Sequence, residues 1–402
     1  MWVNHQHSES IPLHCSPLLS SPLLSKTMAK KHYFPLLLSI SIFIFTGCSE
    51  PKTSSVTVDP QNDAKPAKEI TLADDANIVT ALTKLGAEFK KNRDGLITEV
   101  NLIGTNASDA DLEQLGLLSQ LTSLRLNETN ISETGMEDVG KLTNLVNLDL
   151  RGCSINNESM KAIEGLSQLR ALRLSGESGS TTVDDDGMAS INKLTSLKAL
   201  LLDHLWISEV GLTDLADLKN LEELYLAKTL IDDASLAVLT QHPKLKKLRI
   251  SQTQISDAGL ESLVALENLT DLDLSENSII SDLGMEHVGK ITTLKRLNLW
   301  RVALSDFGVG KLAGLKEIDW LNLDNTSLSD TGLIHLQGMA KITFLHLGST
   351  TITDAGLVHL EGLTTLKDLK VTRTAVTEEG VASLNKKLPT TEIQLKYLGN
   401  GQ

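Results

Sequence analysis

The chain of 402 residues carries 37 lysines and arginines against 51 aspartates and glutamates, a formal net charge of −14. This acidic balance argues against nucleic acid as a partner, because binding to phosphates needs a basic surface. Hydrophobic residues make up 41% of the chain, which is ordinary for a globular protein and excludes general disorder. Aromatic residues make up only 3%, so the core must be aliphatic.

The N-terminal region contains the pattern of an export signal. Lys30 and Lys31 precede an apolar run at 34–45, and Thr46-Gly47-Cys48 comes next. This order is typical of a cleaved signal, and the apolar run is too short to cross a bilayer as a helix. Its end resembles the lipobox of bacterial lipoproteins. The resemblance implies a mature chain that starts at Cys48 and is held by lipid at the outer membrane or facing the periplasm. The alternative is an uncleaved or conventionally cleaved signal, in which the cysteine is incidental.

We expect five segments along the chain. Residues 1–47 combine an upstream extension with the signal, because a start at Met28 gives a signal of ordinary length, although translation from Met1 stays open. The other segments are a flexible tether at 48–70, a capping helix and hairpin at 71–96, repeats at 97–390, and a closing strand and tail at 391–402.

The cap is predicted from a helical pattern followed by a turn. A helix is expected over 74–90, with one apolar face formed by Ile78, Ala81, Leu82, Leu85 and Phe89. Residues 92–95, Asn-Arg-Asp-Gly, then predict a hairpin turn that leads into the first repeat.

A pattern of 24 residues repeats twelve times from residue 97 onward. Leu121-x-x-Leu124-x-Leu126 is typical, and units of this kind follow one another with two small insertions. The apolar alternation predicts a short strand, and the small polar residue three positions later, often threonine, predicts a turn. In the segment 256–266 we expect Ser256 to cap a helix whose leucines face the core, with Asp257 near its positive end.

These repeats resemble the leucine-rich repeat family, in the 24-residue variety of bacterial and F-box-associated proteins. The resemblance covers residues 97–395 and implies an α/β solenoid shaped as a curved horseshoe. Parallel strands would form its concave face and helices its convex face. The family is used mostly for protein recognition, so the fold alone does not name a ligand.

No motif in the sequence asks for catalysis, a metal or a cofactor. The acidic run 184–187 could suggest calcium, but it lacks the spacing of an EF-hand, and in register Asp184 is a helix cap. His287, His335 and His359 occupy equivalent helix positions without a third ligand type at a defined spacing. We therefore expect no enzyme, with no catalytic residues, no metal site and no cofactor.

The variable strand positions are the candidates for binding, because their side chains point out of the concave face. Two groups stand out from the plain polar background: Trp300, Arg301, Trp320, Phe344 and His346, and a smaller group of Tyr225 and Arg249. Aromatic residues and arginine dominate interface energetics, which favours a binding surface. The alternative is that these rings only pack sideways against their neighbours. If they bind, we expect Trp300 and Trp320 to stand on adjacent strands.

The favoured interpretation is a non-enzymatic lipoprotein that binds a protein or peptide on its concave face outside the cytoplasm. Its partner would be a protein or peptide of unknown identity, not nucleic acid, and it would meet the membrane only through lipid at Cys48. The alternative is a soluble intracellular adaptor or enzyme inhibitor of the leucine-rich repeat type, in which the N-terminal pattern is spurious.

Overall fold

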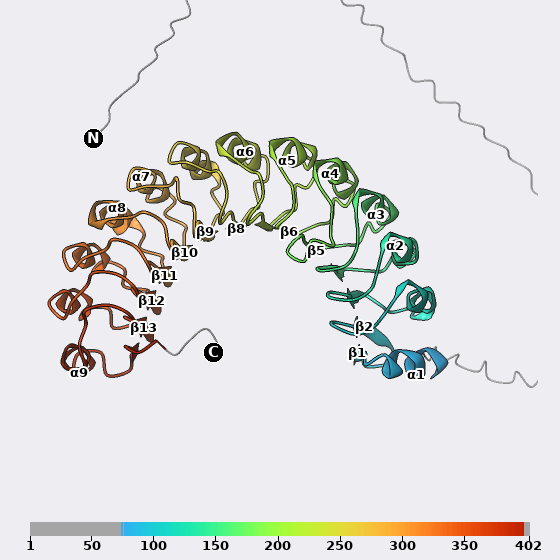
Figure 1. Ribbon diagram of the computed structural model, residues 1–402, viewed down its shortest axis with the longest axis horizontal. Helices are drawn as coiled ribbons and strands as arrows, with labels where there is room; N and C mark the ends of the chain where they lie inside the picture. The colour runs from blue at the N-terminus through green and yellow to red at the C-terminus, as the bar shows by residue number, and fades with distance from the viewer. Residues whose placement is uncertain (1–73, 75, 398–402) are drawn as a thin grey trace, which may run out of the picture. The chain divides into compact units, whose positions relative to one another are not determined.

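The computed structural model describes residue 74 and residues 76–397, in which strands line the inside of an arc and helices the outside (Figure 1). The predicted signal, the tether and Cys48 lie outside these residues. Within them, no helix is both long enough and apolar enough to cross a membrane.

The strands of the described region form one sheet in chain order. They begin with β1 Glu88–Lys91, β2 Ile97–Asn101, β3 Ser123–Arg125, β4 Asn147–Asp149, β5 Ala171–Ser175, β6 Ala199–Asp203 and β7 Glu223–Tyr225. They continue with β8 Lys247–Arg249, β9 Asp271–Asp273, β10 Arg296–Asn298, β11 Trp320–Asn322, β12 Phe344–His346, β13 Asp368–Lys370 and β14 Glu392–Gln394. Only β1 and β2 are antiparallel; every later pair is parallel.

Short helices alternate with the strands. The α-helices are α1 Ala76–Lys84, α2 Glu133–Gly140, α3 Asn157–Ala162, α4 Asp185–Ile191, α5 Glu209–Asp214, α6 Asp233–Leu239, α7 Met285–Val288, α8 Asp306–Lys311 and α9 Glu378–Asn385. The 3-10 helices are η1 Asp109–Asp111, η2 Glu113–Leu117, η3 Gly259–Ala265, η4 Leu312–Gly314, η5 Gly332–Leu336 and η6 Gly356–Leu360. This alternation confirms the predicted α/β solenoid.

The predicted strand register is confirmed by the pairing. Leu272 in β9 lies between Leu248 in β8 and Leu297 in β10, and all three side chains are buried. Equivalent leucines continue through the stack and form one aliphatic core with the apolar faces of the helices. No single repeat could bury its leucines alone, so stability is shared between neighbours.

The N-terminal cap corrects the predicted helix. Helix α1 ends at Lys84, and Gly86 has a φ of 88°, which ends the helix well before residue 90. Phe89 therefore lies in β1, where it pairs with Val100 of β2. The hairpin turn at 92–95 is present, with Gly95 at a φ of 83°.

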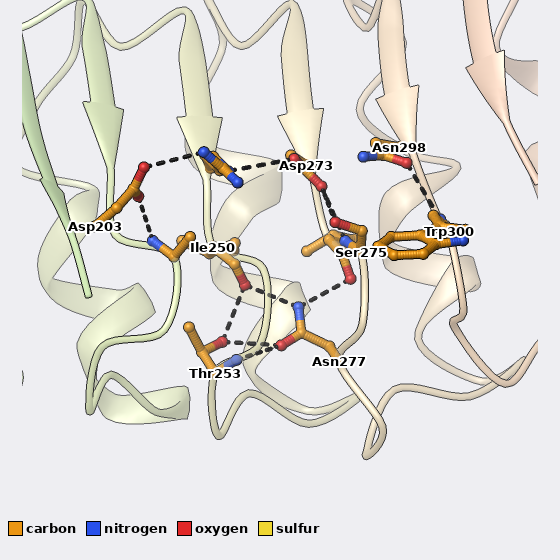
Figure 2. A network of polar contacts seen from close by, with 11 residues as sticks. Asp203, Ile250, Thr253, Asp273, Ser275, Asn277, Asn298 and Trp300 are labelled. Carbon is orange, nitrogen blue, oxygen red and sulfur yellow. Dashed lines mark hydrogen bonds and ion pairs between the residues drawn. The ribbon is translucent and has the colours of Figure 1, made fainter. Parts of the chain in front are cut away.

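The turns after most of the parallel strands share two recurrent residues. One residue adopts a left-handed conformation, as Lys228 does at a φ of 56°. The threonine that follows donates a hydroxyl hydrogen bond to the carbonyl of the apolar residue directly after the strand, as Thr229 does to Leu226 at 2.7 Å. Asn277 replaces threonine in one repeat and donates to the carbonyls of both Ile250 and Leu274 (Figure 2). The predicted role of the small polar residue is thus confirmed.

A second recurrent contact joins successive repeats where their helices begin. The carboxylate of Asp257 accepts hydrogen bonds from the backbone N–H of Ser281, at 2.7 Å, and from its hydroxyl group. A Cβ atom at Gly284 would overlap the same carboxylate, so glycine is required there. We call this arrangement the Asp ladder; it recurs at eight aspartates, Asp109, Asp185, Asp233, Asp257, Asp282, Asp306, Asp330 and Asp354.

This ladder changes two predicted roles. Asp257 was expected to act on its own helix, but its hydrogen bonds run to the next repeat. Ser256 accepts a hydrogen bond from the Ala258 N–H, yet η3 is a 3-10 helix that begins only at Gly259. Asp184, in contrast, caps α4 as predicted by accepting a hydrogen bond from the Asp186 N–H at 3.1 Å.

Candidate binding surface

Two rings stack on the concave face at its C-terminal end. Trp320 and Phe344 start β11 and β12 and pair directly across the sheet. Their ring centroids are 4.9 Å apart and the ring planes differ by 5°. Leu321 and Leu345, the next residue in each strand, are buried, so the alternation of a strand turns both rings away from the core. We call Trp320 and Phe344 the aromatic stack.

Cations flank the aromatic stack on both sides. The Arg296 guanidinium, from β10, lies 4.7 Å from the Trp320 ring centroid. The Lys370 ammonium, from β13, lies 5.5 Å from the Phe344 ring. His346 meets the edge of Phe344 at 6.4 Å, and burial lowers its pKa, which favours the neutral imidazole. Arg296 also lies 3.1 Å from the Asp271 carboxylate, so its charge is already matched within the fold. The surface therefore offers aromatic area beside the Lys370 ammonium group, and aromatic residues are common in interface hot spots.

Trp300 does not join this stack, which corrects the expected adjacency of the two tryptophans. Trp320 pairs with Arg296, and Trp300 follows four residues later, beyond the end of β10. Arg301 comes next in a left-handed conformation, with a φ of 57°. Its guanidinium lies 5.4 Å from the Trp300 ring and 3.3 Å from the Glu276 carboxylate. These two residues therefore form a separate group.

The second predicted group, Tyr225 and Arg249, lines a central hollow of about 890 Å³ that also reaches Trp300. The Arg249 guanidinium lies between two carboxylates, 3.0 Å from Asp203 and 3.6 Å from Asp273 (Figure 2). Its charge is therefore already matched within the fold. The structure thus places Tyr225, Arg249 and Trp300 around one hollow and leaves the aromatic stack outside it.

Burial controls the protonation of the groups around the central hollow. It raises the pKa of Asp203 despite the opposing effect of Arg249. Burial also raises the pKa of Tyr225, with a further contribution from a hydrogen bond to Glu223. The tyrosine hydroxyl consequently remains protonated and is suited to hydrogen bonding rather than to nucleophilic attack.

The histidines of the convex side are not brought into a metal centre. His287 lies in α7, His335 in η5 and His359 in η6, and His359 Nδ1 lies 3.0 Å from the Gln337 amide nitrogen. Across the described part of the chain, no group of three or more histidine, cysteine, aspartate or glutamate side chains could hold a metal ion. The acidic run at 184–187 is used by the repeats, since Asp184 bonds Asn157 and Asp185 bonds Ser208.

Sequence reasoning missed an exposed apolar edge. Trp206 is 75% exposed and Phe307 is 58% exposed, and both lie close to the start of a helix. Trp206 follows β6, and Phe307 is the second residue of α8. Most equivalent positions in other repeats carry small or polar residues, and this contrast was the signal available in the sequence.

The sequence and the fold resemble those of known proteins. A family profile described as Leucine Rich repeat matches residues 141–163, 241–264 and 265–288. These three segments are similar to leucine-rich repeats. No curated protein matches the sequence significantly.

Solved structures similar to this chain include one with a TM-score above 0.5. The internalin inlF of Listeria monocytogenes strain 4b F2365 is 19% identical, with 80% of this chain and 94% of that chain covered and a TM-score of 0.56. The internalin inlC2 of the same strain is 24% identical over 57% of this chain and 93% of its own, with a TM-score of 0.42. A TDR receptor is 16% identical over 74% and 55%, with a TM-score of 0.48. At these identities the likeness establishes the fold alone.

Proposed function

We propose that this chain is a non-enzymatic leucine-rich repeat lipoprotein, built from the 24-residue bacterial variety of repeat, that binds a protein or peptide on its concave face. The observation that carries the proposal is the aromatic stack. Two large rings are turned away from an aliphatic core, between the Lys370 ammonium group and an arginine that is paired with Asp271. They offer a partner apolar area with an ammonium group at its border.

Sideways packing is the competing explanation of the same rings. The stack does bring Trp320 and Phe344 into contact, and cross-strand aromatic pairs stabilise sheets by about 0.2–1 kcal/mol. The two explanations differ in what a truncation changes. A packing pair affects only the free energy of unfolding, whereas a binding pair affects the affinity for the partner.

The test compares two tryptophans of the same chain. Partners are first captured by crosslinking on intact cells, and the best one is then titrated against wild type and variants. Trp320→Ala should weaken binding at least about fivefold to thirtyfold, equivalent to about 1–2 kcal/mol, because it removes a central aromatic anchor. Trp206→Ala is the matched control, since this exposed ring lies away from the concave strands. Equal affinity of wild type and Trp320→Ala would contradict the proposal.

The site of action is proposed to be outside the cytoplasm, at a bacterial membrane. Support comes from the basic, apolar and small residues that precede Cys48. Metabolic labelling with a fatty acid should mark the wild-type chain, whereas Cys48→Ala should carry no label and accumulate as a precursor. Labelling that persists in Cys48→Ala would contradict the anchor. An unlabelled wild-type chain recovered in the cytoplasm would favour an intracellular adaptor or enzyme inhibitor instead.

A further inference from the structure

Three arginines gather at the N-terminal end of the concave face. Arg125 of β3 and Arg173 of β5 lie on either side of Asp149 of β4, in direct register across the sheet. Arg151, two residues after Asp149, turns back onto this carboxylate. All four side chains line one hollow of about 270 Å³. The arrangement is notable in an acidic chain because it concentrates positive charge at one point.

The single carboxylate at the centre is already paired with one of the three arginines. Arg151 binds it with both ends of its guanidinium group, Nε at 2.9 Å and a terminal nitrogen at 2.7 Å. The Asp149 side chain is only 4% exposed, so an incoming group cannot reach it easily. Two-point contact of this kind is the strongest form of a carboxylate–guanidinium pair. The ion pair of Asp149 is thus formed with Arg151 and not with Arg125 or Arg173.

The other acidic group of the hollow is also engaged. Glu99 lies 2.9 Å from the ammonium group of Lys90 in the neighbouring strand. Among the described residues, no acidic side chain lies within ion-pair distance of Arg125 or Arg173. The hollow thus presents two guanidinium groups whose charges are not matched within the fold. Arg249 differs, because Asp203 and Asp273 hold it from both sides.

We propose that Arg125 and Arg173 form a subsite that binds the carboxylate of an acidic side chain in the captured peptide or protein. Strands are about 4.8 Å apart, so the two arginines start about 10 Å from each other and can approach a ligand from opposite sides. Each guanidinium presents several N–H donors in a fixed plane, which suits a carboxylate. This assignment rests on the proposed function, since it names one chemical feature of the partner.

The distance between the subsite and the aromatic stack also predicts a spacing between two residues of the partner. Seven strand steps separate β4 from β11, or about 34 Å at about 4.8 Å per step. An extended chain advances about 3.3 Å per residue, so about ten residues span that distance. A single extended segment that crosses the concave face would therefore carry an acidic residue about ten positions from an apolar or aromatic residue that meets the aromatic stack.

The test uses the full chain and a defined probe. A blocked tetraglutamate peptide is titrated at low ionic strength, where charge interactions are least screened, with tetraglutamine and inorganic phosphate as further probes. The test variant is Arg125→Gln/Arg173→Gln. The control variant Arg93→Gln/Arg170→Gln removes the same charge from two exposed arginines outside the hollow. Circular dichroism checks that both variants fold.

Tetraglutamate should bind with saturation, tetraglutamine should not, and the test variant should bind at least tenfold more weakly than wild type and the control variant. An equal loss of tetraglutamate affinity in both double variants would show a diffuse charge attraction and would overturn the subsite. Binding of tetraglutamate to wild type without saturation would overturn it as well. Phosphate that binds more tightly than tetraglutamate would overturn the carboxylate assignment. Trp320→Ala should bind tetraglutamate normally, so failure of the subsite is separate from failure of the aromatic stack.

Discussion

The edge where helices begin and the concave face are built from the same repeats but follow opposite rules. Along the edge, the Asp ladder places the same atoms in the same contacts, with the backbone hydrogen bonds at 2.7–2.8 Å in all eight cases. Across the concave face, three arginines give way to a central hollow and then to the aromatic stack. Uniform contacts hold the solenoid together, and varied side chains are left free to bind.

The exceptions to the ladder support this distinction. Where glutamate replaces aspartate, at Glu133 and Glu209, the glycine of the next repeat becomes Ser159 and Ser235. Each serine then completes a capping box within its own helix: the Ser235 N–H donates to the Asp232 carboxylate, and the Asp232 N–H donates to the Ser235 hydroxyl oxygen. Asn157 also replaces a ladder aspartate; it keeps the glycine of the next repeat, Gly187, and exchanges hydrogen bonds with Asp184. The facing residues of the edge thus change together. Outward residues of neighbouring concave strands also form pairs, but these differ from place to place, from the Arg296–Asp271 ion pair to the stacked rings of Trp320 and Phe344.

The largest effect expected is the loss of an inward strand residue. Leu124→Ala in β3 should destabilise the fold by about 2–5 kcal/mol, because Leu124 is fully buried and the change leaves a cavity. Ser123→Ala, one residue earlier and directed outward, should cost less than about 0.5 kcal/mol. Urea denaturation of both variants measures the difference. Similar losses would show that inward and outward positions are not distinct in energy.

A change at the ladder should come next in size. Gly284→Ser should cost about 1–3 kcal/mol, because its Cβ atom meets the Asp257 carboxylate and the Leu260 side chain. The triple variant Asp257→Glu/Ser281→Asp/Gly284→Ser copies the native set Glu209, Asp232 and Ser235, and should be more stable than Gly284→Ser alone.

Thermal and chemical unfolding of wild type, the single variant and the triple variant provide the comparison. A triple variant no more stable than Gly284→Ser would mean that the residues of the edge do not act as a matched set. Partner affinity should be unchanged in every folded ladder variant, since none of these residues faces the concave side.

The smallest effect concerns Glu222, which forms ion pairs with lysines of two neighbouring repeats. Lys198 and Lys246 each lie 2.7 Å from the Glu222 carboxylate and lower its pKa to about 2 from an ordinary value of 4.5. A pKa lowered by folding stabilises the protein above the unfolded value, and this contribution is lost as pH falls through the folded value. All three side chains are partly exposed, so the contribution of these ion pairs to the free energy of unfolding should stay below about 1 kcal/mol.

Glu222→Gln tests this small term. Its melting temperature should fall below that of wild type at about pH 6, and the gap should narrow as pH falls toward about 3. A gap that widens on acidification would contradict the assigned direction of the pKa shift.

Much of the fold follows from periodicity, because leucine spacing alone determines which residues face the core. That spacing predicted the strands, the register of Leu248, Leu272 and Leu297, and the threonine turns. It could not give the length of each helix. Helix α1 ends at Lys84 because Gly86 adopts a positive φ, and η3 forms a 3-10 helix in place of the expected α-helix.

The candidate surface was harder to predict. A repeat pattern shows to which face of the sheet a side chain is directed, but it shows less readily at which position along the strand that residue lies. Trp300 follows the last leucine of its strand, whereas Trp320 precedes the middle leucine of the next, so the two cannot be neighbours. Counting the position of each tryptophan from the paired leucines, Leu297 and Leu321, would have shown that the two rings are offset along the strands. The Asp ladder links residues about one repeat apart, and it becomes visible in sequence only when aspartate is compared with the glycine of the following repeat.

Side-chain footprinting with hydroxyl radicals tests the central distinction most directly, since aromatic rings on the concave face and on the edge are read in one experiment. The full chain is oxidised with and without its crosslink-identified partner, and modification is quantified at each aromatic residue. Partner binding should protect Trp320 and Phe344 and leave Trp206 and Phe307 as reactive as before. Protection of Trp206 and Phe307 with unchanged reactivity of Trp320 and Phe344 would place recognition on the edge and contradict the account.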